Sequence, residues 1–180
     1  MNEMVGNWDV KVAPDALPQK VATAFSELFG EICGASYVPL AYLGSQVVNG
    51  LNHAILAEQT LVTKNPEKNI VVVYLHELNE EFKITNIDKV LAGGYGVGAV
   101  EIAPKTEIPK AVEYQYDAVM KGFLGSVVNP FYYLASQVVN GVNYFLAAEV
   151  KPVIPQAESS VQIIMFNSTT KEVKFTYVLG

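Results

Sequence analysis

The chain carries one pentapeptide twice, and this repeat restricts the fold more than any other feature of the sequence. Gln-Val-Val-Asn-Gly occupies residues 46–50 and again residues 137–141, 91 positions later. The same offset aligns residues 15–89 with residues 106–180 without a gap, and about twenty of the aligned positions are identical. Agreement of this extent is typical of an internal duplication. We therefore expect two copies of one folding unit.

The region between the two copies is rich in glycine. The segment Ala-Gly-Gly-Tyr-Gly at residues 92–96 has a composition that interrupts helices and strands. We therefore expect a first domain over residues 1–90, a glycine-rich linker over residues 91–97 and a second domain over residues 98–180. A unit of about 90 residues is large enough to form a modest core of its own.

Each copy shows the same succession of helix and strand patterns. In the first copy Pro18 suits a first helical turn, apolar residues recur at helical spacing as far as Ile32, and Gly34 is expected to close the helix. Four apolar runs follow, and an Asn-Gly pair, a strong hairpin signal, separates the first two. The expected strands span residues 37–48, 51–63, 70–76 and 82–90, with 128–139, 142–153, 161–166 and 173–179 in the second copy.

These patterns predict an α+β fold. We expect two tandem domains, each with one helix packed across a four-stranded antiparallel sheet. The helix would bury its apolar side against one face of the sheet.

The composition indicates a globular protein and excludes some partners. Apolar residues make up 51% of the chain, charged residues 17%, and the net charge is −6. Because no basic stripe could neutralise phosphates, we expect no nucleic-acid partner. No segment reaches the roughly 20 apolar residues of a membrane span, and residues 1–8 lack the apolar run of a signal peptide. We expect a cytoplasmic protein with no membrane partner, or a secreted protein if a signal peptide has been removed.

The reactive side chains suggest no catalytic or metal centre. The single cysteine, Cys33, follows an apolar helical face and is expected to be buried, and it can form no disulfide within the chain. His53 and His76 have no histidine counterparts in the second copy and no spacing typical of metal ligands. We therefore expect no enzymatic activity, no metal and no cofactor.

The repeated segment resembles a known family signature. Residues 45–52, Ser-Gln-Val-Val-Asn-Gly-Leu-Asn, resemble the cystatin signature Ser-Gln-Val-Val-Ala-Gly-Thr-Asn-Tyr, and in the second copy the match continues into Tyr144. The helix, the long first strand, the signature hairpin and the final hairpin also follow the order of that family. The resemblance implies an inhibitor of papain-like cysteine proteases that blocks the active-site cleft as a wedge. The parts of the wedge are a glycine in the amino-terminal arm, the signature hairpin and the final hairpin.

The resemblance assigns protease-binding residues to matching positions in both copies. The arm glycine is Gly6 in the first copy and Gly98 in the second. The full set of implied contacts is Val5, Gly6, Gln46, Val47, Val48, Asn49, Gly50, Leu78, Asn79, Val97, Gly98, Gln137, Val138, Val139, Asn140, Gly141, Thr169 and Thr170.

Both copies depart from the signature at the same position. Asn49 and Asn140 stand where the signature has alanine. A larger side chain in a tight cleft can overpack it at a cost of about 1–3 kcal/mol. This change leaves an alternative function open, a non-inhibitory protein-binding or scaffold module of the same fold. In either case we expect a monomer, with a domain-swapped dimer as the alternative assembly.

Overall fold

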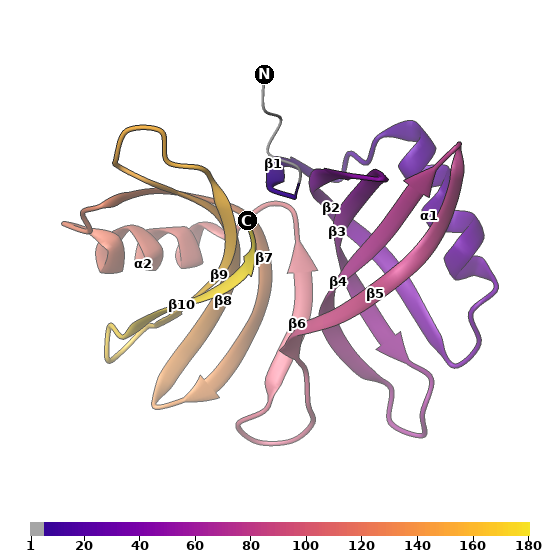
Figure 1. The fold of residues 1–180 in the computed structure, drawn as a ribbon. Coiled ribbons are helices and arrows are strands. Elements are labelled where there is room, and N and C mark those ends of the chain that lie inside the picture. Colours follow the sequence, from indigo (N-terminus) through magenta and orange to yellow (C-terminus); the bar gives the residue numbers. More distant parts are fainter. Residues whose placement is uncertain (1–5) are drawn as a thin grey trace. The chain divides into compact units, whose positions relative to one another are not determined.

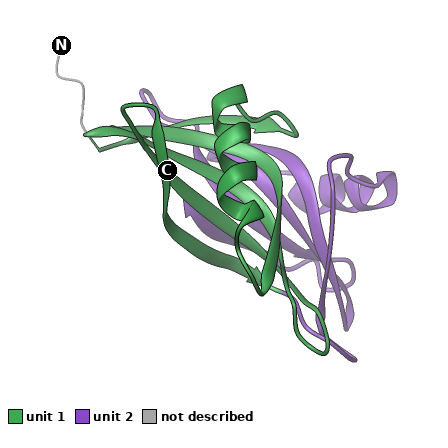
Figure 2. Ribbon diagram, turned by 90° about the vertical axis from the view of Figure 1, so that its right-hand side faces the viewer, with its two compact units in different colours: residues 1–92, 180 green, residues 93–179 purple. Residues whose placement is uncertain are grey.

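The computed structural model of the chain describes residues 6–180. The strands of the described part cover 57% of the chain, and its helices cover 13%. The chain divides into two compact units, residues 1–92 with residue 180, and residues 93–179 (Figure 2). Among the described residues, no helix is both long enough and apolar enough to cross a membrane.

The first unit is a five-stranded antiparallel sheet with one helix inserted between its first two strands (Figure 1). The strands lie side by side in chain order, so every connection after the helix is a hairpin. The elements are β1 (Trp8–Pro14), α1 (Gln19–Gly30), β2 (Ala35–Val48), β3 (Gly50–Leu61), β4 (Glu67–Leu78) and β5 (Glu81–Ala92).

The second unit repeats this arrangement. Its sheet also has five antiparallel strands in chain order, with the helix again between the first two strands. The elements are β6 (Val100–Lys105), α2 (Lys110–Met120), β7 (Ser126–Val139), β8 (Gly141–Pro152), β9 (Ser160–Asn167) and β10 (Val173–Leu179).

The structure corrects the predicted fold class. The expectation of an α+β fold with one helix on a four-stranded sheet is wrong, because the molecule is mostly β and each sheet has a fifth strand. In the first unit the additional strand is β1, which pairs with β2 from Trp8 opposite Gln46 to Pro14 opposite Ala41. Pairing of β1 satisfies backbone groups that would otherwise be open along the edge of β2.

The sequence of β1 has a pattern that is typical of a strand. Trp8 and Val10 alternate with the charged residues Asp9 and Lys11, which is the period of a half-buried strand. The short length of the segment hides this alternation.

The helices end earlier than the sequence predicts. Helix α1 follows Pro18 as expected but ends at Gly30, so Gly34 lies beyond it and forms the turn into β2 with a φ of +85°. Cys33 belongs to this connection, not to the helical face, and it is therefore exposed, contrary to the prediction that it is buried. The chain leaves the helix at a glycine because Gly30 is a poor residue for continuing one.

The core of each unit lies between the helix and one face of its sheet (Figure 2). In the first unit the rings of Phe25 and Phe29 stack with their centroids 4.4 Å apart. Each such side chain contributes about 1.5–3 kcal/mol when it is fully buried. The buried cluster consists of Val21, Phe25, Phe29, Tyr42, Ile55, Ala57, Val71, Val73 and Leu75 in the first unit. The corresponding cluster is Val112, Tyr116, Tyr133, Leu146, Ala148, Val150, Ile164 and Phe166 in the second.

Candidate functional site

The repeated pentapeptide forms the tip of the β2–β3 hairpin in the first unit and of the β7–β8 hairpin in the second. We call residues 46–50 and 137–141 the apical hairpins. In the first, Val48 is paired with Gly50, so the asparagine between them is the apex. Only the glycine of each Asn-Gly pair has a positive φ, +96° at Gly50 and +82° at Gly141. The turn therefore needs glycine at one position only.

The side chains at the apical hairpins face solvent. Val47 is 48% exposed, and Val138 and Val139 are 66% and 44% exposed. The apical asparagines are exposed as well, and among the described residues their carboxamides have no hydrogen-bond partner. Stiff apolar side chains beside an unbonded amide therefore make up the surface of each tip.

The two glycines of the apical hairpins also pack tightly against the last hairpin of their own unit. A Cβ atom on Gly50 would collide with the carbonyl oxygen of Glu77, and one on Gly141 would collide with the side chain of Thr169. The absence of a side chain at these positions lets the two hairpins of each unit lie in contact.

The arm glycines lie beside the apical hairpins. Gly6 and Gly98 are exposed, with φ values of +112° and +79°. Gln46 donates from Nε2 to the carbonyl oxygen of Gly6 at 2.7 Å, and Gln137 donates to that of Gly98 at 2.9 Å. The structure thus brings the predicted arm and hairpin residues together in both units.

Of the two valines that precede the arm glycines, the structure describes one. Val97 is fully exposed. Val5 lies outside the described residues.

The tips of the last hairpins differ between the units. In the first unit Asn79 and Glu80 form a two-residue turn with φ values of +52° and +64°, next to the exposed Leu78. In the second unit Thr169 and Thr170 are exposed in a longer loop.

The longer loop is held by one buried side chain. Asn167 Oδ1 accepts hydrogen bonds from the backbone N–H groups of Thr169 and Thr170, each at 2.8 Å. Its Nδ2 donates to the backbone carbonyl of Asn140 at 3.1 Å, which connects the loop to the apical hairpin. The backbone at the two predicted contact residues of this loop is therefore hydrogen-bonded to Asn167.

Four polar residues that the sequence did not assign to the site connect its parts. In the first unit Asn52 donates from Nδ2 to Gln46 Oε1 at 2.8 Å, and its Oδ1 accepts from His76 Nδ1 at 2.9 Å. In the second unit Asn143 donates to Gln137 Oε1 at 3.0 Å and accepts from Asn167 Nδ2 at 2.8 Å. The asparagine is conspicuous in the repeated motif, but the alignment of His76 with Asn167 shows no identity that could have marked that position.

We call the three parts together the binding edge of each unit. It comprises the arm glycine, the apical hairpin and the tip of the last hairpin. All three lie at the same end of the sheet, because β1 begins opposite Gln46 and β4 ends beside the start of β3.

Among the described residues, a polar cluster around the buried His53 lies behind the binding edge of the first unit. His53 contacts the Tyr42 hydroxyl through Nδ1 and Glu77 Oε2 through Nε2, both at 2.7 Å, and Lys20 bonds to the other carboxylate oxygen of Glu77. Burial raises the pKa of the Glu77 carboxyl, but the hydrogen bonds and charges of Lys20 and His53 together outweigh it and leave that pKa below its ordinary value of 4.5. Burial also raises the pKa of the Tyr42 hydroxyl.

The second unit does not repeat this cluster. At the positions of His53 and Glu77 it has Tyr144 and Ser168. The cluster therefore cannot carry a function that both units share.

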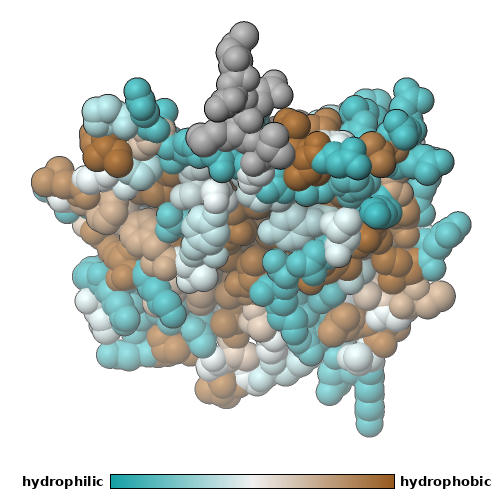
Figure 3. All heavy atoms as spheres, viewed as in Figure 1, coloured by the Kyte–Doolittle hydropathy of each residue, from teal (hydrophilic) through white to brown (hydrophobic). Residues whose placement is uncertain are grey.

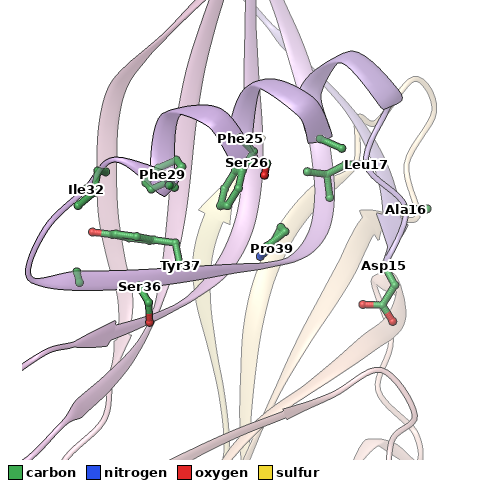
Figure 4. A pocket seen from close by; sticks show the side chains of 13 residues that line it. Asp15, Ala16, Leu17, Phe25, Ser26, Phe29, Ile32, Ser36, Tyr37 and Pro39 are labelled. Atoms are coloured by element: carbon green, nitrogen blue, oxygen red, sulfur yellow. The ribbon is translucent and has the colours of Figure 1, made fainter.

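A cavity of about 770 Å³ lies between α1 and β2 in the first unit (Figure 4). The rings of Phe25, Phe29 and Tyr37 point into the space between the helix and the strand. A cavity of about 440 Å³ occupies the same place in the second unit. None of the lining residues belongs to a binding edge.

Surface hydrophobicity alone does not identify a site. On the face of the molecule shown in Figure 3, apolar residues are scattered among polar ones. The candidate site therefore rests on geometry that recurs in both units.

The chain was compared with protein-family models, with curated proteins and with solved structures. No family model matches it, and neither of the other comparisons finds a significant match.

Proposed function

We propose that the chain is an inhibitor of papain-like cysteine proteases and that each unit blocks the active-site cleft with its binding edge. The observation that carries this proposal is the recurrence of one three-part edge in both units. In each unit an arm glycine is bonded to a hairpin tip that exposes valine side chains. The signature-like residues and the arm glycine are far apart in the sequence but adjacent in the structure, and this proximity supports the proposal.

The physical properties of the edge suit binding without cleavage. The valines at each tip expose apolar surface, and exposed apolar surface at a tip favours contact with a partner. The tip is held by strand pairing on both sides, and the arm is held by a side-chain hydrogen bond. A surface that is already ordered loses little conformational freedom on binding.

The apical asparagines favour the second candidate function, a non-inhibitory protein-binding or scaffold module. Because the carboxamides of Asn49 and Asn140 have no hydrogen-bond partner in the described chain, they lose hydrating water when a cleft closes over them. An uncompensated amide costs about 1–3 kcal/mol on transfer from water into a protein interior. A cleft without a matching polar group would therefore bind these tips weakly.

Titration of papain with the full chain tests the proposal. We expect inhibition by the wild-type chain and a loss of about 30-fold or more in the affinity of one unit for Val47→Asp and of the other for Val138→Asp. The variant with both changes should lose inhibition through both units.

The chain offers matched controls for these variants. Val62 and Val153 are aligned valines that are 71% and 65% exposed at the other end of the sheets. Val62→Asp and Val153→Asp should leave inhibition unchanged. A folded wild-type chain that does not inhibit papain at micromolar concentration would refute the proposal. If the Asn49→Ala and Asn140→Ala double variant then did inhibit, the scaffold function would be favoured.

A further inference from the structure

A row of polar side chains crosses each sheet directly behind the apical hairpin. Gln46, Asn52 and His76 occupy paired positions on β2, β3 and β4. In the second unit Gln137, Asn143 and Asn167 occupy the same paired positions on β7, β8 and β9. Adjacent members of each row are hydrogen-bonded, and each row ends on the backbone carbonyl of an arm glycine.

The order of the bonds determines which way each carboxamide points. A carboxamide has one end that accepts and one that donates hydrogen bonds. Because Asn52 Oδ1 accepts from His76, its Nδ2 is available to donate to Gln46 Oε1. Because Gln46 Oε1 is then occupied, its Nε2 faces the carbonyl of Gly6. The orientation of the central asparagine thus determines whether the glutamine presents a donor to the arm.

The same bonds persist although the two units differ in sequence. The donor at the start of the row is a histidine in the first unit and an asparagine in the second. The arm glycine lies 40 residues before the glutamine in the first unit and 39 residues before it in the second. A bond that forms between the same two atoms despite these differences indicates that the row sets the position of the arm.

We propose that Asn52 and Asn143 are positioning residues that hold the arm against the apical hairpin. They do not lie among the expected protease contacts and act through Gln46 and Gln137. The role in binding rests on the proposed function, because an arm held in this way presents its glycine and the hairpin tip to the cleft as one ordered surface. The fixing of the arm itself is a property of the free protein.

Asn52→Asp in the full chain tests the row with little change in side-chain shape. The new carboxylate can accept from His76 but cannot donate to Gln46 Oε1. Gln46 is then expected to rotate its Nε2 toward the carboxylate and its Oε1 toward the carbonyl of Gly6, which repels the arm. We expect the NMR order parameter of the Gly6 amide to fall from about 0.8 to below about 0.6, while that of Gly98 stays unchanged.

Gln59→Ala is the matched control. Gln59 also lies on β3 and makes two side-chain hydrogen bonds, to the Tyr37 hydroxyl at 2.8 Å and from Asn69 at 3.0 Å. The Gln59→Ala variant should have a lower free energy of unfolding and an unchanged order parameter of the Gly6 amide. The proposal would be overturned if the order parameter of the Gly6 amide were unchanged in the folded Asn52→Asp variant. It would also be overturned if Gln59→Ala lowered that order parameter equally.

Inhibition provides the second measurement. In the Val138→Asp background, which isolates the first unit, Asn52→Asp should weaken papain inhibition about three- to tenfold, and Gln59→Ala should not. If Asn52→Asp lowers the order parameter of the Gly6 amide but leaves papain inhibition undiminished, the proposed role of Asn52 in binding is wrong. If the wild-type chain does not inhibit papain, the proposed function fails, and the order of Gly6 alone then decides whether the row positions the arm.

Discussion

At the scale of single residues, the two units have different side chains behind their equivalent binding edges. The first unit buries a histidine there: His53 is 4% exposed and is bonded to Tyr42 on one side and to Glu77 on the other. The sequence could not indicate this arrangement, because the three residues belong to three different strands. Lys20 and His53 bond to Glu77 and so contribute to the stability of the first unit, whereas the second unit has Ser168 at the position of Glu77.

Glu77→Gln should lower stability in a pH-dependent way. Because the pKa of Glu77 is lowered in the folded state, its contribution to stability is present above pH 4.5 and is lost as the pH falls through the folded-state pKa. We expect the variant to lose about 1–3 kcal/mol of unfolding free energy at pH 7, and the difference from wild type to shrink below pH 4.5. Urea denaturation from pH 7 to below pH 4.5 measures the difference in unfolding free energy and its dependence on pH. A difference that is constant with pH would contradict the assignment, and Glu58→Gln, at a longer ion pair of 3.6 Å, serves as the control.

At the scale of elements, the last hairpins show how loop length changes a turn. The β4–β5 hairpin has a two-residue turn in which both Asn79 and Glu80 adopt positive φ, the geometry that matches the twist of a hairpin. Glutamate is unfavourable in this conformation, because its Cβ crowds the backbone. Glycine has no such penalty.

Glu80→Gly should therefore stabilise the protein. We expect a gain of about 0.5–1 kcal/mol in the free energy of unfolding, because the new residue adopts the required φ without strain. Equilibrium denaturation of the full chain gives the value. Glu81→Gly is the control, since Glu81 begins β5 and glycine weakens a strand. If both variants lost stability equally, the turn geometry would not be the cause.

At the scale of the whole molecule, each unit has its own core. The buried cluster of the first unit is formed only by residues between Val21 and Leu75, and that of the second only by residues between Val112 and Phe166. Each sheet is also complete within its unit, because no strand of one sheet is hydrogen-bonded to the other sheet in the described part of the chain. The elements needed for folding are thus contained in each half.

The two halves should fold separately. We expect fragments of residues 1–92 and 93–180 each to unfold in one cooperative urea transition, because each retains its whole sheet and core. The m-value should be about 1 kcal/mol/M for chains of this size. Circular dichroism and the dispersion of amide NMR signals measure folding. A fragment that stays unfolded at neutral pH would show that its core is insufficient alone.

Features that depend on local chemistry, or on comparison of the two copies, could be predicted from the amino-acid sequence. The repeated pentapeptide indicated two equivalent hairpins, and Pro18 marked the start of a helix. Because the backbone preferences of single residues act over a few positions, these features can be predicted from the sequence.

Features that depend on residues far apart in the chain could be recognised only in the three-dimensional fold. The segment from Trp8 to Pro14 became a fifth strand because the edge of β2 lay open to it, and Cys33 became exposed because the helix ended before it. The row from His76 through Asn52 and Gln46 to Gly6 exists only when the strand register places those side chains opposite one another. A hydrogen bond between side chains requires distances and directions that the spacing of residues along a chain does not specify.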